Sequence, residues 1–221
     1  RGRAAMAAAV AVLVSGGGTN LQALLDAAAA GAAFAVVHVV ADRENAFALE
    51  RARRAGVATT VVAYRDFADR AAFERALGDA LAATGAQWVA LAGFMRVLGA
   101  ELVARWRGRM LNIHPSLLPA FRGLHTHRRV LAAGLRVTGC TVHVVTPELD
   151  DGPVVVQAAV PVLDGDTEET LAARVLEQEH AAYPLALELL ASGRAVVDGA
   201  RVRLTVPAAA VPAGLLWPRP G

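Results

Sequence analysis

The chain has 221 residues, of which 55% are hydrophobic, and a formal net charge of +2. This length and apolar content suffice for the core of one α/β domain, and they exclude a predominantly disordered protein. All 22 basic residues are Arg. Because Schiff-base, pyridoxal-phosphate and P-loop NTPase chemistry each uses a Lys side chain, the composition excludes those mechanisms in their usual form.

The basic residues are spread along the chain, and the isoelectric point of about 9.3 reflects how few groups lose a proton above neutral pH. The densest basic stretches, 51–54 and 105–109, contain one aromatic residue between them, Trp106. One ring is a poor platform for stacking bases, so we expect no nucleic-acid partner.

A single Cys, Cys140, excludes an internal disulfide and a CxxC zinc site, and we interpret it as a small buried side chain. The longest apolar stretch, 27–41, falls short of the roughly 20 residues that a membrane span requires. Residues 1–9 lack the long apolar region of a secretory signal. We therefore expect a cytoplasmic protein without a membrane partner.

Short apolar runs alternate with helical patterns along the first half of the chain. The runs 10–14, 36–40, 59–63 and 88–92 predict buried strands, and helical spacing after Leu21, over 46–55 and over 70–81 predicts helices. Continuous apolar strands indicate a parallel sheet with helices on both faces, the doubly wound α/β architecture. Ligands bind such sheets beyond the carboxyl ends of the strands, so we expect function in the loops 15–20, 92–98, 112–123 and 146–153.

The second half predicts a different strand arrangement. Residues 110–113 predict a strand, and the runs 139–145 and 154–160 predict an antiparallel pair on a mixed sheet. Thr167 should open a long helix to about Ala191, which Pro184 should kink or split. A hairpin around Asp198-Gly199 should follow. We expect one domain over 10–206, a disordered extension over 1–9 and a mobile tail over 207–221.

The loop Ser15-Gly16-Gly17-Gly18-Thr19-Asn20 follows a predicted strand and opens a predicted helix. Backbone N–H groups and the helix dipole at such a loop favour an anion, most often phosphate. The loop has no Lys, and Leu21 occupies the position of the third glycine in the dinucleotide fingerprint. A glycine turn needed only for packing remains an alternative.

Asn112 and His114 alternate on one side of a predicted strand that Pro115 ends. A histidine there could act as a general acid or base, and the amide could donate to developing negative charge. Asp150 is a candidate partner for the histidine, although spacing does not establish the pairing. The alternatives are a structural histidine and, for the Asp150-Asp151-Gly152-Pro153 segment, turn chemistry.

Six segments together resemble the folate-dependent formyltransferase family: 15–20, 92–96, 112–119, 123–127, 149–153 and 178–180. The resemblance implies a Rossmann-like formyltransferase fold, doubly wound and mostly parallel, with an antiparallel strand near the C-terminus. It also implies transfer of the formyl group of 10-formyltetrahydrofolate to the primary amine of glycinamide ribonucleotide in purine synthesis. The folate would be a cosubstrate, with no metal and no tightly bound cofactor.

Residue roles follow from the same resemblance. His114 is similar to the proton-transferring residue, Asn112 to the oxyanion donor, and Asp150 to the group that keeps His114 protonated and oriented. The residues that match the ribonucleotide site are Gly18, Thr19, Asn20 and Glu179. Those that match the folate site are Arg70, Met95, Arg96, Val97, Leu98, Asn112, Thr146, Pro147, Glu148, Leu149 and Asp150.

Two positions depart from the family pattern. Asp151 stands where a small residue is expected, and its carboxylate could change the pKa of Asp150 or point into solvent. Leu176 stands where a polar residue near the ribonucleotide is expected. His125 and His127 have no carboxylate nearby in sequence to complete a metal site, so we predict none. We interpret His143 as a half-buried strand residue, with a position near the cleft as the alternative, and His38 and His180 as structural.

Three other functions are alternatives to this transfer reaction. A formyltetrahydrofolate deformylase would resemble a chain with an added N-terminal regulatory domain. A methionyl-tRNA formyltransferase would need a further C-terminal domain, whereas about seventeen residues follow Leu204. A non-catalytic nucleotide-binding module would keep the phosphate site without the chemistry. We expect two small-molecule substrates as partners and a monomer or a homodimer.

Overall fold

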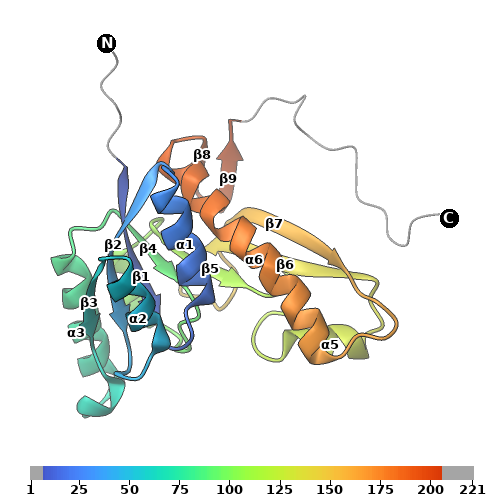
Figure 1. Cartoon of the computed structure of the whole chain (residues 1–221), viewed down its shortest axis with the longest axis horizontal. Coiled ribbons are helices and arrows are strands. Elements are labelled where there is room, and N and C mark those ends of the chain that lie inside the picture. Colours follow the sequence, from blue (N-terminus) through green and yellow to red (C-terminus); the bar gives the residue numbers. More distant parts are fainter. Residues whose placement is uncertain (1–6, 206–221) are drawn as a thin grey trace.

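A computed structural model describes residues 7–205, and its core is a seven-stranded sheet in the order β3-β2-β1-β4-β5-β6-β7 (Figure 1). The strands are β1 (Ala8–Val14), β2 (Phe34–Ala41), β3 (Ala58–Val61), β4 (Trp88–Leu91), β5 (Met110–His114), β6 (Val137–Val144) and β7 (Val154–Pro161). Strands β1 to β5 are parallel, and β6 is antiparallel to both β5 and β7. The predicted mostly parallel sheet with an antiparallel strand is confirmed.

Helices cover both faces of this sheet, as the continuous apolar strands predict. The helices α1 (Thr19–Ala29), α2 (Phe47–Arg54), α5 (Thr126–Ala132) and α6 (Glu168–Ala191) contribute to one apolar cluster. The helices α3 (Arg70–Ala83) and α4 (Ala100–Arg105) contribute to a second cluster on the opposite face, beside the 3₁₀ turn η1 (Tyr64–Asp66). Val10 and Leu13 of β1 are completely buried between the two layers.

The long helix α6 begins with a capping box, in which Thr167 and Thr170 each accept a hydrogen bond from the other's backbone N–H. Pro184 lies inside α6, but the helix continues to Ala191, so the expectation of a split is wrong. Proline removes one helical hydrogen bond, and here the packing of neighbouring buried residues maintains the helix. Among them, the Tyr183 hydroxyl lies 2.9 Å from the Leu91 carbonyl oxygen and 3.1 Å from that of Leu111.

Other differences from the sequence predictions are local. β1 begins at Ala8, so residues 8 and 9 belong to the sheet and not to a disordered extension. The hairpin of β8 (Ala195–Asp198) and β9 (Arg201–Leu204) forms as predicted, as a separate two-stranded sheet. The expectations for residues 1–6 and for the tail over 207–221 fall outside the described residues.

Cys140 lies on β6, and its side chain is buried in the first apolar cluster, as the sequence predicts. Burial, and to a smaller extent the nearby Glu179 carboxylate, raises the pKa of the Cys140 thiol to about 12. Within residues 7–205, no helix has both the length and the apolar character needed to cross a bilayer.

Candidate active site

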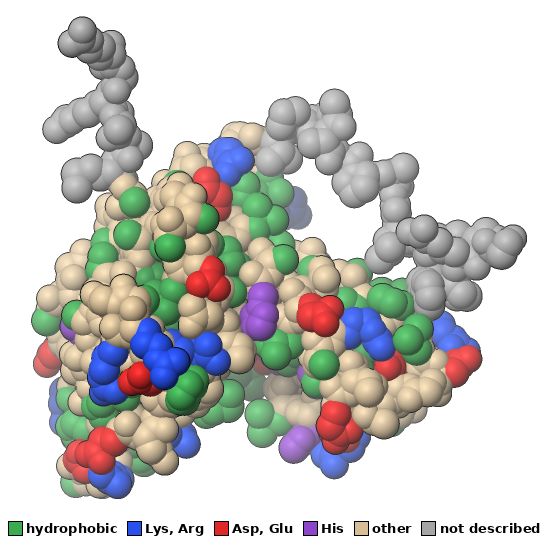
Figure 2. All heavy atoms as spheres, viewed as in Figure 1, with side chains coloured by type: hydrophobic (Ala, Val, Ile, Leu, Met, Phe, Trp, Pro, Cys, Tyr) green, Lys and Arg blue, Asp and Glu red, His purple; other side chains and the backbone are tan. Residues whose placement is uncertain are grey.

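Polar side chains line one face of β5 and β6. Leu111 of β5 belongs to the cluster under α6, so alternation directs Asn112 and His114 toward the opposite face. In the β5–β6 register, Asn112 is opposite His143 and His114 is opposite Thr141. Figure 2 shows the surface hollowed between the part of the molecule that carries β1 to β3 and the part that carries α5.

His114 and Asp150 meet, although 36 positions separate them in the chain. The Nδ1 atom of His114 lies 3.4 Å from Oδ2 of Asp150, and its Nε2 atom lies 2.9 Å from the carbonyl oxygen of Phe121. Asp150 Oδ2 also accepts a hydrogen bond from the N–H of Gly123 at 2.9 Å. A carboxylate and a carbonyl can only accept, so both ring nitrogens of His114 face hydrogen-bond acceptors.

Asn112 is held by His143, which is buried and not half-buried as the sequence predicts. The Nδ2 atom of Asn112 lies 3.3 Å from His143 Nε2, and His143 Nδ1 lies 3.1 Å from the carbonyl oxygen of Val144. Burial lowers the pKa of His143, despite opposing effects of that carbonyl and of Asp150. A neutral ring that donates from Nδ1 therefore accepts at Nε2 from the Asn112 amide. The sequence contains the alternation of Thr141 and His143 but not the register that brings His143 opposite Asn112.

The departure at Asp151 has a structural explanation. Its carboxylate pairs with the Arg122 guanidinium, and both side chains are partly exposed. Asp151 therefore connects the loop that contains Gly123 to the loop that contains Asp150. Of the two alternatives for Asp151, the structure favours an outward-facing side chain.

The glycine loop stands at the N-terminus of α1, with Gly18 as the N-cap at φ 72°. A Cβ atom on Gly18 would lie 2.6 Å from the Cβ of Ala48, so α2 can approach the loop only because this residue is glycine. No side chain caps α1, which leaves its first N–H groups available to an anion. Helix α2 supports the loop, because Ala48 N donates to Gly16 O and Arg51 Nε donates to Gly17 O.

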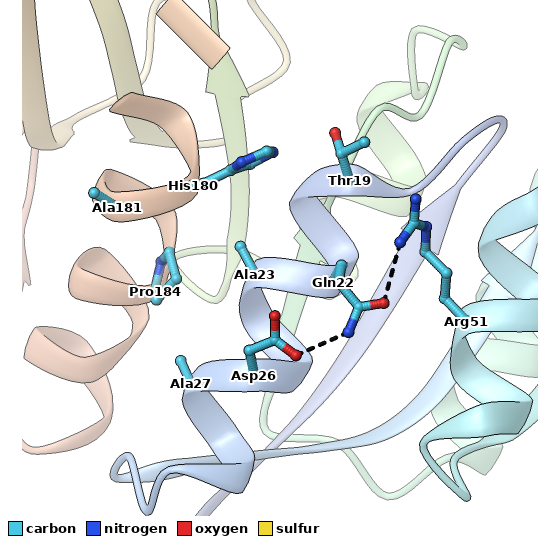
Figure 3. Close-up of a pocket in the computed structure, with 9 residues that line it drawn as sticks. All are labelled: Thr19, Gln22, Ala23, Asp26, Ala27, Arg51, His180, Ala181 and Pro184. Atoms are coloured by element: carbon cyan, nitrogen blue, oxygen red, sulfur yellow. Dashed lines mark hydrogen bonds between the residues drawn. The ribbon is translucent and has the colours of Figure 1, made fainter. Parts of the chain in front are cut away.

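A groove of about 560 Å³ runs beside this loop between α1 and α6 (Figure 3). Thr19, Arg51 and His180 line one end of the groove, and Asp26, Ala27 and Pro184 line the other. Arg51 forms hydrogen bonds with Gly17 O and Gln22 Oε1 and makes no ion pair with a carboxylate among residues 7–205. Its positive charge is therefore available to an anion at the glycine loop.

A buried polar pair links α1 and α6 below the loop. Asn20 Nδ2 donates to Glu179 Oε2 at 2.7 Å, and both residues are about nine-tenths buried. Burial raises the pKa of Glu179, and the bond from Asn20 opposes that shift. The structure thus brings together Gly18, Thr19, Asn20 and Glu179, whereas Leu176 is half-buried on the same helix as Glu179.

The segments matched to folate flank the polar face of β5. Met95 and Val97 expose 73% and 60% of their surface, Leu98 is buried, and Arg70 donates from Nη2 to the carbonyl oxygen of Val97. Because β6 is antiparallel, the loop after it starts beside Met110, where Val145 N donates to Met110 O. That loop contains Thr146, Pro147, Glu148 and Leu149, the last three exposed, before Asp150 reaches His114. Leu98 and Val145 belong to one apolar cluster, so both segments lie on the same face of the sheet.

Comparison with known proteins agrees with this arrangement. The family model described as formyl transferase matches residues 8–187. The phosphoribosylglycinamide formyltransferase of Escherichia coli is 48% identical over 84% of the chain and 88% of that enzyme. The crystal structure of glycinamide ribonucleotide transformylase 1 from Symbiobacterium toebii superimposes with a TM-score of 0.88 at 48% identity, over 91% of the chain and 95% of that structure. The chain belongs to the formyl transferase family.

Within the family, the chain is similar to the phosphoribosylglycinamide formyltransferases just described. It is also 48% identical, over 86% of its length, to the trifunctional purine biosynthetic protein adenosine-3 of Gallus gallus. The chain spans 19% of that longer protein. A formyltetrahydrofolate deformylase from Burkholderia mallei is similar at 28% identity and a TM-score of 0.83, over 91% of the chain and 71% of that structure.

Proposed function

We propose that the chain transfers the formyl group of 10-formyltetrahydrofolate to the primary amine of glycinamide ribonucleotide, in purine synthesis. The observation that carries this proposal is the approach of His114 to Asp150 beside Asn112, on the face where both folate-matched segments lie. The 48% identity to an enzyme named for this reaction supports the choice of acceptor over water, since the deformylase is similar at 28%.

The ribonucleotide binds with its phosphate at the start of α1, against the backbone N–H groups of Gly18, Thr19 and Asn20. Arg51 adds a positive charge beside that site, and Glu179 contacts the same substrate from α6. The folate lies along residues 95–98 and 146–150, where main-chain polar groups and the exposed side chains of Met95, Val97 and Leu149 surround it.

The reaction proceeds through a tetrahedral intermediate. The amine attacks the formyl carbon, and the carbonyl oxygen becomes an oxyanion that the Asn112 amide and protonated His114 stabilise by hydrogen bonding. The carbon–nitrogen bond to the folate then breaks, the folate nitrogen gains a proton, and the former amine loses one. His114 mediates this proton transfer, and Asp150 keeps the ring oriented and its protonated form stable.

The folate is a cosubstrate in this proposal, and the chain needs no tightly bound cofactor. Its partners are the two small-molecule substrates. We expect it to act in the cytoplasm, as a monomer or a homodimer.

The test follows the absorbance of tetrahydrofolate released by the wild type, His114→Ala and Asp150→Asn. Each substitution should reduce kcat by about 10² or more, because each disturbs stabilisation of the oxyanion or the proton transfer. Calorimetric titration should show that both variants still bind glycinamide ribonucleotide. His38→Gln is the matched control, because His38 lies on β2 and bonds to Thr60.

Two results would contradict the proposal. Release of tetrahydrofolate at the same rate without glycinamide ribonucleotide would indicate a deformylase. Binding of the ribonucleotide without any folate turnover by the wild type would indicate a nucleotide-binding module.

A further inference from the structure

The side chain of Arg96, in the segment 95–98, contacts two residues distant in sequence, Asp42 and Tyr64. Its Nε donates to Asp42 Oδ2 at 2.7 Å, and its guanidinium lies 3.7 Å from the centre of the Tyr64 ring. Asp42 follows β2 directly and its side chain is completely buried. Its second oxygen, Oδ1, accepts from Arg43 Nε at 3.2 Å.

This carboxylate stands near the place where dinucleotide-binding folds position an acidic residue for a ribose. Here each of its oxygens already accepts a hydrogen bond from a guanidinium. A buried carboxylate holds such partners firmly, because losing both of them would leave its charge uncompensated. The geometry therefore favours a structural contact to Arg96 over recognition of a sugar.

The rest of the segment is held through its main chain and through the buried side chain of Leu98. Met95 N donates to Ser15 Oγ at 3.0 Å, Val97 O accepts from Arg70, and Gly99 N donates to Glu74 Oε1 at 2.9 Å. The side chains of Met95 and Val97 are exposed and do not anchor it. Arg96 thus supplies a partly buried side-chain anchor in the middle of the segment, between the exposed side chains of Met95 and Val97.

We propose that Asp42 is a positioning residue for folate binding, acting through Arg96. By fixing that guanidinium against Tyr64, Asp42 keeps the main chain of residues 95–98 in one conformation before the folate arrives. Such preorganisation lowers the entropy that binding must remove. The inference rests on the proposed function, which places the folate along this segment.

The test compares steady-state constants of the wild type and Asp42→Asn. The KM for 10-formyltetrahydrofolate should rise by about tenfold, as expected for loss of a charge-assisted hydrogen bond, while kcat and the KM for the ribonucleotide stay unchanged. Amide hydrogen exchange over residues 93–99 should become faster. A purely stabilising role would lower the melting temperature without separating the two KM values.

Two further variants make the test specific. Arg43→Gln is the matched control, because it removes the other partner of Asp42, which is 47% exposed, and leaves the bond to Arg96 intact. It should keep the wild-type KM for folate. Arg96→Gln should raise that KM as Asp42→Asn does, and the double variant should show no further increase.

If Asp42→Asn does not fold, Tyr64→Leu replaces it, because this change removes the ring under the guanidinium and keeps the ion pair. An unchanged folate KM in the folded variant, or additive effects of Asp42→Asn and Arg96→Gln, would overturn the inference. A wild type that transfers no formyl group would instead overturn the proposed function, and the exchange measurement would still decide whether Asp42 orders the segment.

Discussion

Asn112 depends on a neighbouring histidine for its orientation. An amide side chain can rotate between two nearly equivalent positions, and the acceptor nitrogen of neutral His143 favours the one in which an N–H group faces that ring. The second N–H of the same amide is then oriented independently of the substrate. An oxyanion donor works best when it is positioned before the charge develops.

His143→Ala should therefore lower kcat by about tenfold or more, through loss of a partly buried hydrogen bond that orients Asn112, with smaller changes in both KM values. Single-turnover measurements of formyl transfer would test this. Thr141→Val, on the same face of β6, should not impair Asn112 in this way, although it removes the hydrogen bonds of the Thr141 hydroxyl with Leu118 N, Ser116 O and Gln157 Nε2. A wild-type kcat in His143→Ala would contradict the orienting role.

Among individual residues, the sequence predicts those whose side-chain chemistry is unusual for their position. It does not predict residues that only position another side chain. His114 before a proline suggests catalysis, and Asp150 is a reasonable partner that the structure brings to 3.4 Å. Asp42 and Arg96 are 54 positions apart, and nothing in either local sequence indicates their contact. The contact can be identified only from the folded sheet, in which the strands that precede the two residues, β2 and β4, both pair with β1.

Helix α2 serves as a support for the glycine loop. Its Arg residues have different partners. Arg53 and Arg54 form ion pairs with Glu50, whereas Arg51 donates a hydrogen bond to the Gly17 carbonyl oxygen. Figure 2 shows the resulting cluster of basic side chains on the surface over α2. A cationic side chain without a carboxylate partner, next to a helix N-terminus, strengthens an anion site.

Arg51→Gln should raise the KM for glycinamide ribonucleotide by about tenfold, because the phosphate loses a nearby charge. The KM for the folate should not change. Arg54→Gln is the matched control on the same helix. Competition by inorganic phosphate provides a direct check, since equal inhibition of the wild type and Arg51→Gln would show that Arg51 does not contribute to phosphate binding.

The predictability of the helices and strands depends on how much of each is buried. Strands β1, β2 and β4 appear in the sequence as continuous apolar runs because both of their faces are covered. Helix α4 has six residues, too few for a periodic pattern, and was not predicted. The sequence did not predict that α6 continues through Pro184 without a break, because local propensity omits the packing of Tyr183 and its buried neighbours against the sheet.

For the whole molecule, one buried and three half-buried histidines among the described residues couple stability to pH. Burial is the largest cause of a lowered pKa at His38, His127, His143 and His180. The unfolded chain therefore takes up protons at a higher pH than the folded chain does. Stability from these groups is fully present above the unfolded value of 6.5 and is lost as the pH falls through and below it.

We expect the melting temperature to fall between about pH 7.5 and pH 5.5, the interval that contains the unfolded histidine pKa. Burial raises the pKa of Glu179, so this residue makes the folded state more stable as the pH falls, opposite to the histidines. The melting temperature should therefore be measured in the Glu179→Gln variant. In that background, His143→Gln should reduce the fall. An equal fall with and without His143 would exclude a contribution from this residue.

Because Cys140 is buried, the rate at which its thiol is labelled reports how often the protein opens around β6. A thiol that is completely enclosed, and whose proton is held to about pH 12, does not react with a maleimide until β6 separates from its neighbours. As no other cysteine is present, each labelled molecule records one such event. Ligands that bind the native form should slow this labelling, which allows affinity to be measured on the unmodified chain without following catalysis.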